Sequence, residues 1–187
     1  MSTSIHQSRP RNGVMDARAA KRPDTSWPAA ADLTIDQIWH ELARESFAVL
    51  SHVAPDGQPR SSGVVYAVAD HRLFVVVAPD SWKARQIPAN GKVAVTVPVR
   101  RGGLVSLLAP IPPATISFHG EAVVHPTGWA TEHPLPHRLV SLLPAGRRDN
   151  GCVIEIRPIG EFSIYGLGVS LGQMRNPALA RAHAPVG

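Results

Sequence analysis

The sequence is poor in cysteine and in aromatic residues, and it holds no long apolar run. Cys152 is the single cysteine among 187 residues, so an internal disulfide is excluded and a reducing compartment is expected. A membrane helix needs ~18–20 uninterrupted apolar residues, and the most apolar stretch, from Gly102 to Ala114, is broken by Pro110, Pro112 and Pro113. The basic start is not followed by a short apolar segment with a cleavage site. We therefore expect a cytoplasmic protein without a membrane-bound part.

The net charge of +5 is unevenly distributed. The first 30 residues carry five basic and two acidic side chains, which leaves only +2 for the rest of the chain. A nucleic-acid-binding domain would place basic residues on its folded part, so no nucleic-acid partner is expected. Residues 1–30 are rich in Ser, Arg, Pro and Ala and predict a disordered basic tail. A transit peptide or a nucleic-acid-binding arm is the less favoured interpretation of this segment.

Length and an apolar content of 44% fit one domain with an ordinary core. We assign residues 31–166 to this domain and residues 167–187 to a C-terminal tail. A helix is expected from Thr34 to about Ser46, because Thr34 and Gln37 have the spacing of a capping box. Apolar residues then recur at helical intervals.

Alternating segments rich in β-branched residues predict six strands. They are Phe47–Val53, Ser62–Val68, Arg72–Val77, Lys92–Val99, Thr115–His125 and Cys152–Ile164. The turn Pro55-Asp56-Gly57 and the corner Asp70-His71 join the first three strands into an antiparallel meander. A short helix is expected over Ser81–Ile87, and a second one in the segment from Gly128 to Leu143, beginning after Pro136. The pattern predicts a mainly β fold, as a closed or partly closed barrel or, alternatively, a sandwich.

Four motifs follow one another in an informative order. They are Pro55-Asp56-Gly57-Gln58-Pro59-Arg60, Ser81-Trp82-Lys83-Ala84-Arg85, Asn90-Gly91-Lys92-Val93 and Gly120-Glu121-Ala122. Their order resembles that of the pyridoxamine 5′-phosphate oxidase-like superfamily, from about Ile35 to Ile164. The resemblance implies a six-stranded antiparallel split β-barrel of the FMN-binding type. It also implies a homodimer that holds FMN, or a deazaflavin coenzyme, in grooves at its interface.

The same resemblance implies a site for the phosphate of the cofactor. In similar proteins the positions of Arg60, Ser81 and Lys83 hold this phosphate, and Arg85 and Gln86 are expected as further contacts. The chemistry is suitable, because a guanidinium fork, a Lys point charge and the free amides of a helix N-terminus all favour a dianion.

Strand residues are expected to line the flat ring of the cofactor by similarity. They are Ser62, Gly63, Val64, Val65, Val77 and Ala78. Such residues supply an apolar wall and backbone amides directed at the ring. Gly63 would let the ring approach the backbone, or would mark a bulge. Val64, Val65 and Val77 would also suit the core of a barrel without any ligand. No catalytic side chain is predicted.

We expect a flavin-dependent oxidoreductase that uses FMN and transfers a hydride to or from a small organic substrate. The alternatives are a deazaflavin-dependent reductase and a non-catalytic protein that binds a cofactor or haem, the haem through His183. Two features depart from the family pattern: Pro98 stands where relatives usually continue the fourth strand with large apolar residues, and the proline-rich stretch 108–113 replaces a shorter connection. The spacing Arg181-Ala182-His183 copies a substrate motif of true pyridoxamine phosphate oxidases, but lies in the predicted tail.

Several histidines also raise the question of a metal site. His133 and His137 have the four-residue spacing that places two ligands on one helical face. Pro134 and Pro136 disrupt that face, and neither cysteine nor an acidic residue stands at ligand spacing. No metal site is therefore predicted.

Overall fold

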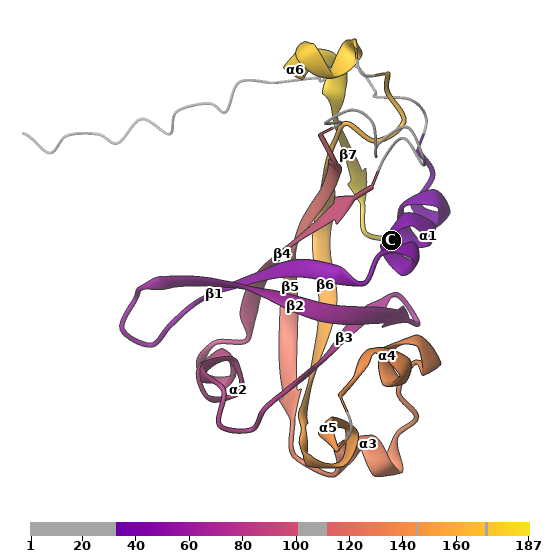
Figure 1. The fold of residues 1–187 in the computed structure, drawn as a ribbon. Coiled ribbons are helices and arrows are strands. Elements are labelled where there is room, and N and C mark those ends of the chain that lie inside the picture. Colours follow the sequence, from indigo (N-terminus) through magenta and orange to yellow (C-terminus); the bar gives the residue numbers. More distant parts are fainter. Residues whose placement is uncertain (1–32, 101–111, 145, 171) are drawn as a thin grey trace, which may run out of the picture.

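The computed structural model describes residues 33–100, 112–144, 146–170 and 172–187. The predicted basic tail of residues 1–30 lies outside these ranges, as does most of the proline-rich stretch 108–113. The six barrel strands are β1 (Phe47–Val53), β2 (Pro59–Ala69), β3 (Arg72–Val77), β4 (Lys92–Val99), β5 (Ala114–His125) and β6 (Cys152–Tyr165). Their order is β3-β2-β1-β4-β5-β6, and an antiparallel β3–β6 pairing closes the barrel (Figure 1). The predicted split β-barrel is thus confirmed.

The β1–β2 hairpin projects beyond the barrel (Figure 1). Its turn depends on Gly57, which has a φ of +81° that L side chains rarely adopt. The amide of Gln58 donates to Oδ1 of Asp56 at 3.1 Å and closes the turn. Strand β2 begins at Pro59, three residues before the predicted start, so that Arg60 lies in the hairpin opposite His52.

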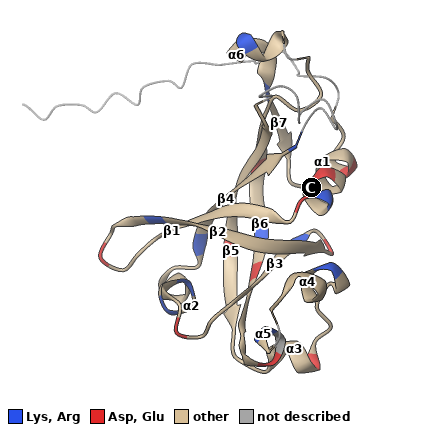
Figure 2. Cartoon of the chain, in the orientation of Figure 1, with Lys and Arg blue, Asp and Glu red and all other residues tan. Residues whose placement is uncertain are grey.

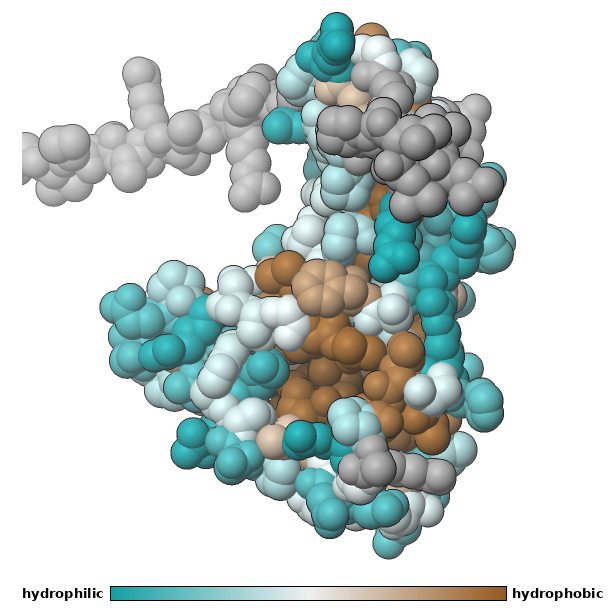
Figure 3. All heavy atoms as spheres, viewed as in Figure 1, coloured by the Kyte–Doolittle hydropathy of each residue, from teal (hydrophilic) through white to brown (hydrophobic). Residues whose placement is uncertain are grey.

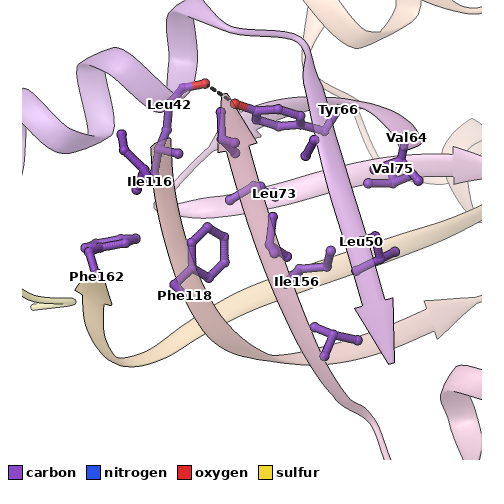
Figure 4. Close-up of a cluster of buried hydrophobic side chains, with 14 of the residues drawn as sticks. Leu42, Leu50, Val64, Tyr66, Leu73, Val75, Ile116, Phe118, Ile156 and Phe162 are labelled. Atoms are coloured by element: carbon purple, nitrogen blue, oxygen red, sulfur yellow. Dashed lines mark hydrogen bonds between the residues drawn. The ribbon is translucent and has the colours of Figure 1, made fainter. Parts of the chain in front are cut away.

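The core lies inside the barrel and under helix α1 (Ile35–Arg44). Thr34 and Gln37 form the predicted capping box, and Leu42 is among the residues that α1 buries. The hydroxyl of Tyr66 donates to the carbonyl oxygen of Leu42 at 2.6 Å (Figure 4). Burial raises the pKa of Tyr66, and the charge of Glu45 acts in the same direction. This side chain therefore remains a neutral donor that ties α1 to the barrel.

Short helices connect the strands. Helix α2 (Trp82–Gln86) and the 3-10 helix η1 (Ile87–Ala89) join β3 to β4, while α3 (Trp129–Glu132), α4 (His137–Leu142) and α5 (Arg147–Asn150) lie between β5 and β6. Helix α4 begins after Pro136, as expected. The guanidinium of Arg138 donates to the carbonyl oxygens of Ala43 and Arg44, which fixes α4 to the end of α1. No helix in the described ranges is long and apolar enough to cross a membrane.

Residues 167–187, which the sequence predicts to be a C-terminal tail, contain secondary structure. The 3-10 helix η3 (Gln173–Arg175) and helix α6 (Pro177–Ala180) precede a seventh strand, β7 (Arg181–Pro185). Strand β7 pairs with the second half of β6, from Glu161 to Tyr165. Arg181 and His183 accordingly lie in a strand rather than in a tail. Pairing with a distant strand stabilises this short segment, whose own sequence has little β propensity.

Candidate functional site

Two residues of the predicted cofactor site come together where α2 meets the β1–β2 hairpin. The ammonium Nζ of Lys83, on α2, lies 3.1 Å from the hydroxyl oxygen of Ser62, on β2. Twenty-one residues separate the two in sequence, and β3 runs between them along the chain. The antiparallel turn back from β2 to β3 and the reversal into α2 therefore bring these two motifs together.

Lys83 is partly buried, and burial lowers its pKa. Its Nζ lies 4.4 Å from the ring centroid of Trp82, a distance at which a cation is attracted to the aromatic face. Among the described residues no carboxylate forms an ion pair with Lys83. The fold thus holds a cation near Ser62 without a charged partner.

Arg60 lies on the same face of β2 as Ser62, because side chains two residues apart in a strand point the same way. Its guanidinium is 4.0 Å from the carboxylate of Asp56, and both side chains are largely exposed. Such a pair contributes little and leaves the guanidinium available to another anion. Figure 2 shows basic residues on α2 and on the projecting hairpin, on the same side of the molecule.

The other predicted phosphate contacts have different surroundings. The hydroxyl of Ser81 caps α2 by accepting from the amide of Ala84 at 3.3 Å, while Arg85 is exposed. Oε1 of Gln86 lies 3.1 Å from Nε2 of His52, so this amide group is already engaged within the protein.

The predicted ring-lining residues divide into two groups. The side chains of Val64 and Val77 are buried in the core, so only their backbone is available to a ligand. Val65 points outward opposite Phe47, and these two side chains expose 44% and 48% of their surface. Ala78, half-buried, directly follows β3 and leads toward α2.

Packing against Phe47, which the sequence does not reveal, explains why position 63 is a glycine. A Cβ atom at this position would lie 2.7 Å from Cε2 of Phe47, so the phenyl ring lies against the backbone of β2. An aromatic side chain of the protein therefore occupies the space over Gly63 in this structure.

An apolar area lies in a hollow of the surface below β1 and β2 and beside α3–α5 (Figure 3). The helical segment is held against the barrel by a small cluster in which Ala130, Leu135 and Val153 are buried. A hollow with an apolar floor and basic residues nearby suits a ligand that is flat and apolar at one end and anionic at the other.

Sequence reasoning does not single out His52 as a residue of the site. His52, on β1, stacks on Trp82 with ring centroids 4.9 Å apart, and it is the buried polar residue of the described core. Its position between the inward-facing Leu50 and Ala54 in the alternation is the available signal. The ring of Trp82 stacks on His52 and lies under the ammonium of Lys83, so this side chain serves packing within the protein.

The remaining histidines do not assemble a metal site among the described residues. His125 and His133 both stack on Trp129, with centroid distances of 4.1 and 4.2 Å. His183, the residue of the haem alternative, lies 3.2 Å from the carboxylate of Glu161. The hollow beside His183 has a volume of about 250 Å³, below the ~300–1,000 Å³ of usual small-molecule sites.

The sequence profile of the pyridoxamine 5′-phosphate oxidase family matches residues 35–135, which include both sides of the Ser62–Lys83 contact. A search of the curated proteins finds no match.

Solved structures with a similar fold include General Stress Protein 26 from Bacillus anthracis str. Sterne. It is 23% identical, with a TM-score of 0.50 over 70% of this chain and 91% of that chain. A pyridoxamine 5′-phosphate oxidase-related, FMN binding protein from Nostoc punctiforme is 12% identical, with a TM-score of 0.52 over 82% and 94% of the two chains. A heme binding protein from Mycobacterium smegmatis is 11% identical, with a TM-score of 0.55 over 82% and 59%. These structures share the barrel, and the names of two of them state different ligands, FMN and heme.

Proposed function

The chain belongs to the pyridoxamine 5′-phosphate oxidase family, and from that membership we propose that it is an FMN-dependent oxidoreductase acting on a small organic substrate. The observation that carries the proposal is the Ser62–Lys83 contact at 3.1 Å beside Arg60. It joins Lys83, which the resemblance assigns to the phosphate of a flavin together with Arg60 and Ser81, to Ser62, which the resemblance assigns to the ring.

The described residues fit a flavin phosphate. Lys83 has a hydroxyl as its hydrogen-bond partner, and Arg60 has a distant, exposed carboxylate. A phosphate dianion would accept from both cations and from the hydroxyl of Ser62, and charge-assisted bonds of this kind are the strong ones. Lowering of the Lys83 pKa by burial also favours this view, because a bound dianion would restore the stability of the ammonium form.

Bound FMN would supply hydride transfer, and the protein would supply orientation and exclusion of water. Val65 and Phe47 offer an apolar face at the surface, and the backbone of β2 offers amides beside it. Neither residue can move a proton. We propose that the positioned ring, rather than a side-chain acid or base, carries the reaction.

We further propose that the protein acts as a homodimer through the outer face of β4, β5 and β6. This face includes the small side chains of Ala94, Thr96, Ser117 and Ser163, with His119, Ile159 and Glu161 beside them. Two adjacent hollows of about 440 and 250 Å³ share Ser117 and Ser163. A sheet surface that includes small side chains can pack closely against another flat surface.

The proposed activity is tested by the absorbance spectrum of the purified protein mixed with FMN, followed by addition of NADH or NADPH under anaerobic conditions. We expect a shifted flavin spectrum and bleaching of the oxidised band upon reduction. Bleaching only by a reduced deazaflavin coenzyme would identify the deazaflavin reductase instead. Tight flavin binding without reduction by any donor would contradict the enzymatic proposal and support a cofactor-binding protein.

A further inference from the structure

A single buried histidine contacts both ends of α2. The ring of His52 stacks on Trp82, the first residue of the helix, at a centroid distance of 4.9 Å and an interplanar angle of 16°. Its Nε2 atom lies 3.1 Å from Oε1 of Gln86, the last residue of the helix. His52 itself belongs to β1, so these two contacts connect the helix to the hairpin.

The hydrogen bond to Gln86 determines which nitrogen of the His52 ring carries the proton. Oε1 of Gln86 can only accept, so Nε2 of His52 carries a proton and donates it. In the neutral ring Nδ1 is then a bare acceptor, and this atom is buried without a partner among the described residues. An unsatisfied buried polar atom costs stability. An aliphatic side chain at this position of β1 would avoid that cost. The contacts of His52 with Trp82 and Gln86 therefore give the reason for a histidine here.

On α2, Lys83 lies between Trp82 and Gln86, the two residues that His52 contacts. Its Nζ reaches Ser62, two residues along β2 from Arg60, which in turn is paired across the hairpin with His52. A five-residue helix has few contacts of its own to fix its position. The direction of Lys83 therefore depends on how firmly the ends of α2 are held.

We propose that His52 is a positioning residue that fixes α2 against the β1–β2 hairpin and so directs the ammonium of Lys83 toward the phosphate of the flavin. The proposal rests on the function proposed above. His52 does not touch the ligand in this arrangement; it acts through Trp82 and Gln86.

The test compares FMN with riboflavin, which lacks the phosphate, in binding titrations of four proteins: wild type, His52→Ala, Lys83→Ala and the double variant. Lys83→Ala should weaken FMN binding on the order of tenfold or more, the effect of losing one charge-assisted bond. His52→Ala should weaken FMN by a similar factor and riboflavin much less. The double variant should bind FMN no more weakly than Lys83→Ala alone, because both changes remove the same contact.

A second readout needs no cofactor. Burial lowers the pKa of Lys83 in the wild type, and release of α2 should move it back toward the ordinary value of a lysine. NMR titration of the Lys83 ammonium in His52→Ala reports this change directly. His52→Phe, which keeps a ring against Trp82 but loses the bond to Gln86, should give an intermediate result. His133→Ala, which removes a histidine stacked on Trp129, is the matched control and should leave both readouts unchanged.

The outcomes separate the two proposals. If Lys83→Ala weakens FMN binding no more than riboflavin binding, the phosphate site itself is wrong. If Lys83→Ala weakens FMN selectively but His52→Ala binds FMN as the wild type does, or keeps the lowered pKa of Lys83, only the role of His52 is overturned. Equal losses for FMN and riboflavin in His52→Ala would show a general folding defect and would also contradict a positioning role.

Discussion

At the scale of single residues, the candidate site consists of cations that the described fold leaves without close carboxylate partners. Arg60 and Lys83 can be named from the sequence as phosphate contacts, because the order of their motifs carries the family resemblance, whereas that resemblance assigns Ser62 to the ring of the cofactor. His52 cannot be named, because the alternation of β1 indicates that its ring faces inward but not that it contacts α2. The family match says nothing of such supporting residues, which are recognised only when their contacts are seen.

A second group of charges acts on stability rather than on binding. Glu155 lies 2.5 Å from the guanidinium of Arg72 and 2.8 Å from Nε2 of His125. Partial burial alone would raise the pKa of Glu155, but the hydrogen bonds and charges of His125 and Arg72 outweigh it and lower the pKa. The ionised carboxylate therefore stabilises the fold.

This stabilisation predicts a pH dependence. A carboxyl group whose pKa is lower in the folded state contributes fully above its unfolded pKa of ~4.3 and loses that contribution as the pH falls through the lower folded value. Urea unfolding between pH 6 and pH 3 should show a shallower decline of the unfolding free energy for Glu155→Gln than for the wild type. Glu132→Gln, at an exposed position, is the control. Parallel curves for all three proteins would mean that the Glu155 cluster does not contribute.

At the scale of elements, sequence-based prediction succeeds where the local signal is strong. The capping box of α1 and the alternation of the six barrel strands identify those elements. The extra residues at the start of β2 escape prediction because Pro59 and Arg60 carry little β propensity. Strand β7 escapes it because its alanines become part of a sheet only through pairing with β6, a contact that no local pattern encodes.

The hairpin that carries Arg60 depends on a turn whose cost can be measured. Gly57 has a φ of +81°, and no other group lies within 4 Å of the position that a Cβ atom would take, so a substitution there is opposed by the backbone alone. Gly57→Ala should lower the unfolding free energy by roughly 1 kcal/mol, the cost of the left-handed conformation for an L residue. Chemical denaturation of Gly57→Ala and the wild type measures this difference in unfolding free energy.

A matched control exists in the same chain. Gly172 has a φ of −65° and open surroundings, so Gly172→Ala should be neutral or slightly stabilising. If both variants unfolded at the same denaturant concentration as the wild type, the turn would not constrain the hairpin.

At the scale of the whole molecule, the barrel presents one face of small residues and one apolar hollow to its surroundings. The family match and the closed barrel show the fold, whereas assembly is a proposal about how the outer face of β4, β5 and β6 is used. The three solved structures compared above are 11–23% identical to the chain and show the fold alone, so the proposed interface rests on the surface of this chain.

Dimerisation predicts about twice the chain mass in light scattering at micromolar concentration. Ser117→Arg would place a long cation between Thr96 and Ser163 on the proposed interface and should shift the population toward the monomer. His40→Arg, at an exposed position of α1, should not. A wild type that is monomeric and still binds FMN tightly would contradict the proposed interface.

The most direct test of the central claim, that the Ser62–Lys83 site with Arg60 holds the phosphate of a flavin, is the difference in binding free energy between FMN and riboflavin. We expect the wild type to prefer FMN, and Arg60→Ala or Lys83→Ala to reduce that preference by roughly 1.5–3 kcal/mol each, the scale of a charge-assisted hydrogen bond. Arg175→Ala, an exposed cation near the C-terminal end, should leave the preference intact. Equal affinity of the wild type for FMN and riboflavin would contradict the proposed phosphate site.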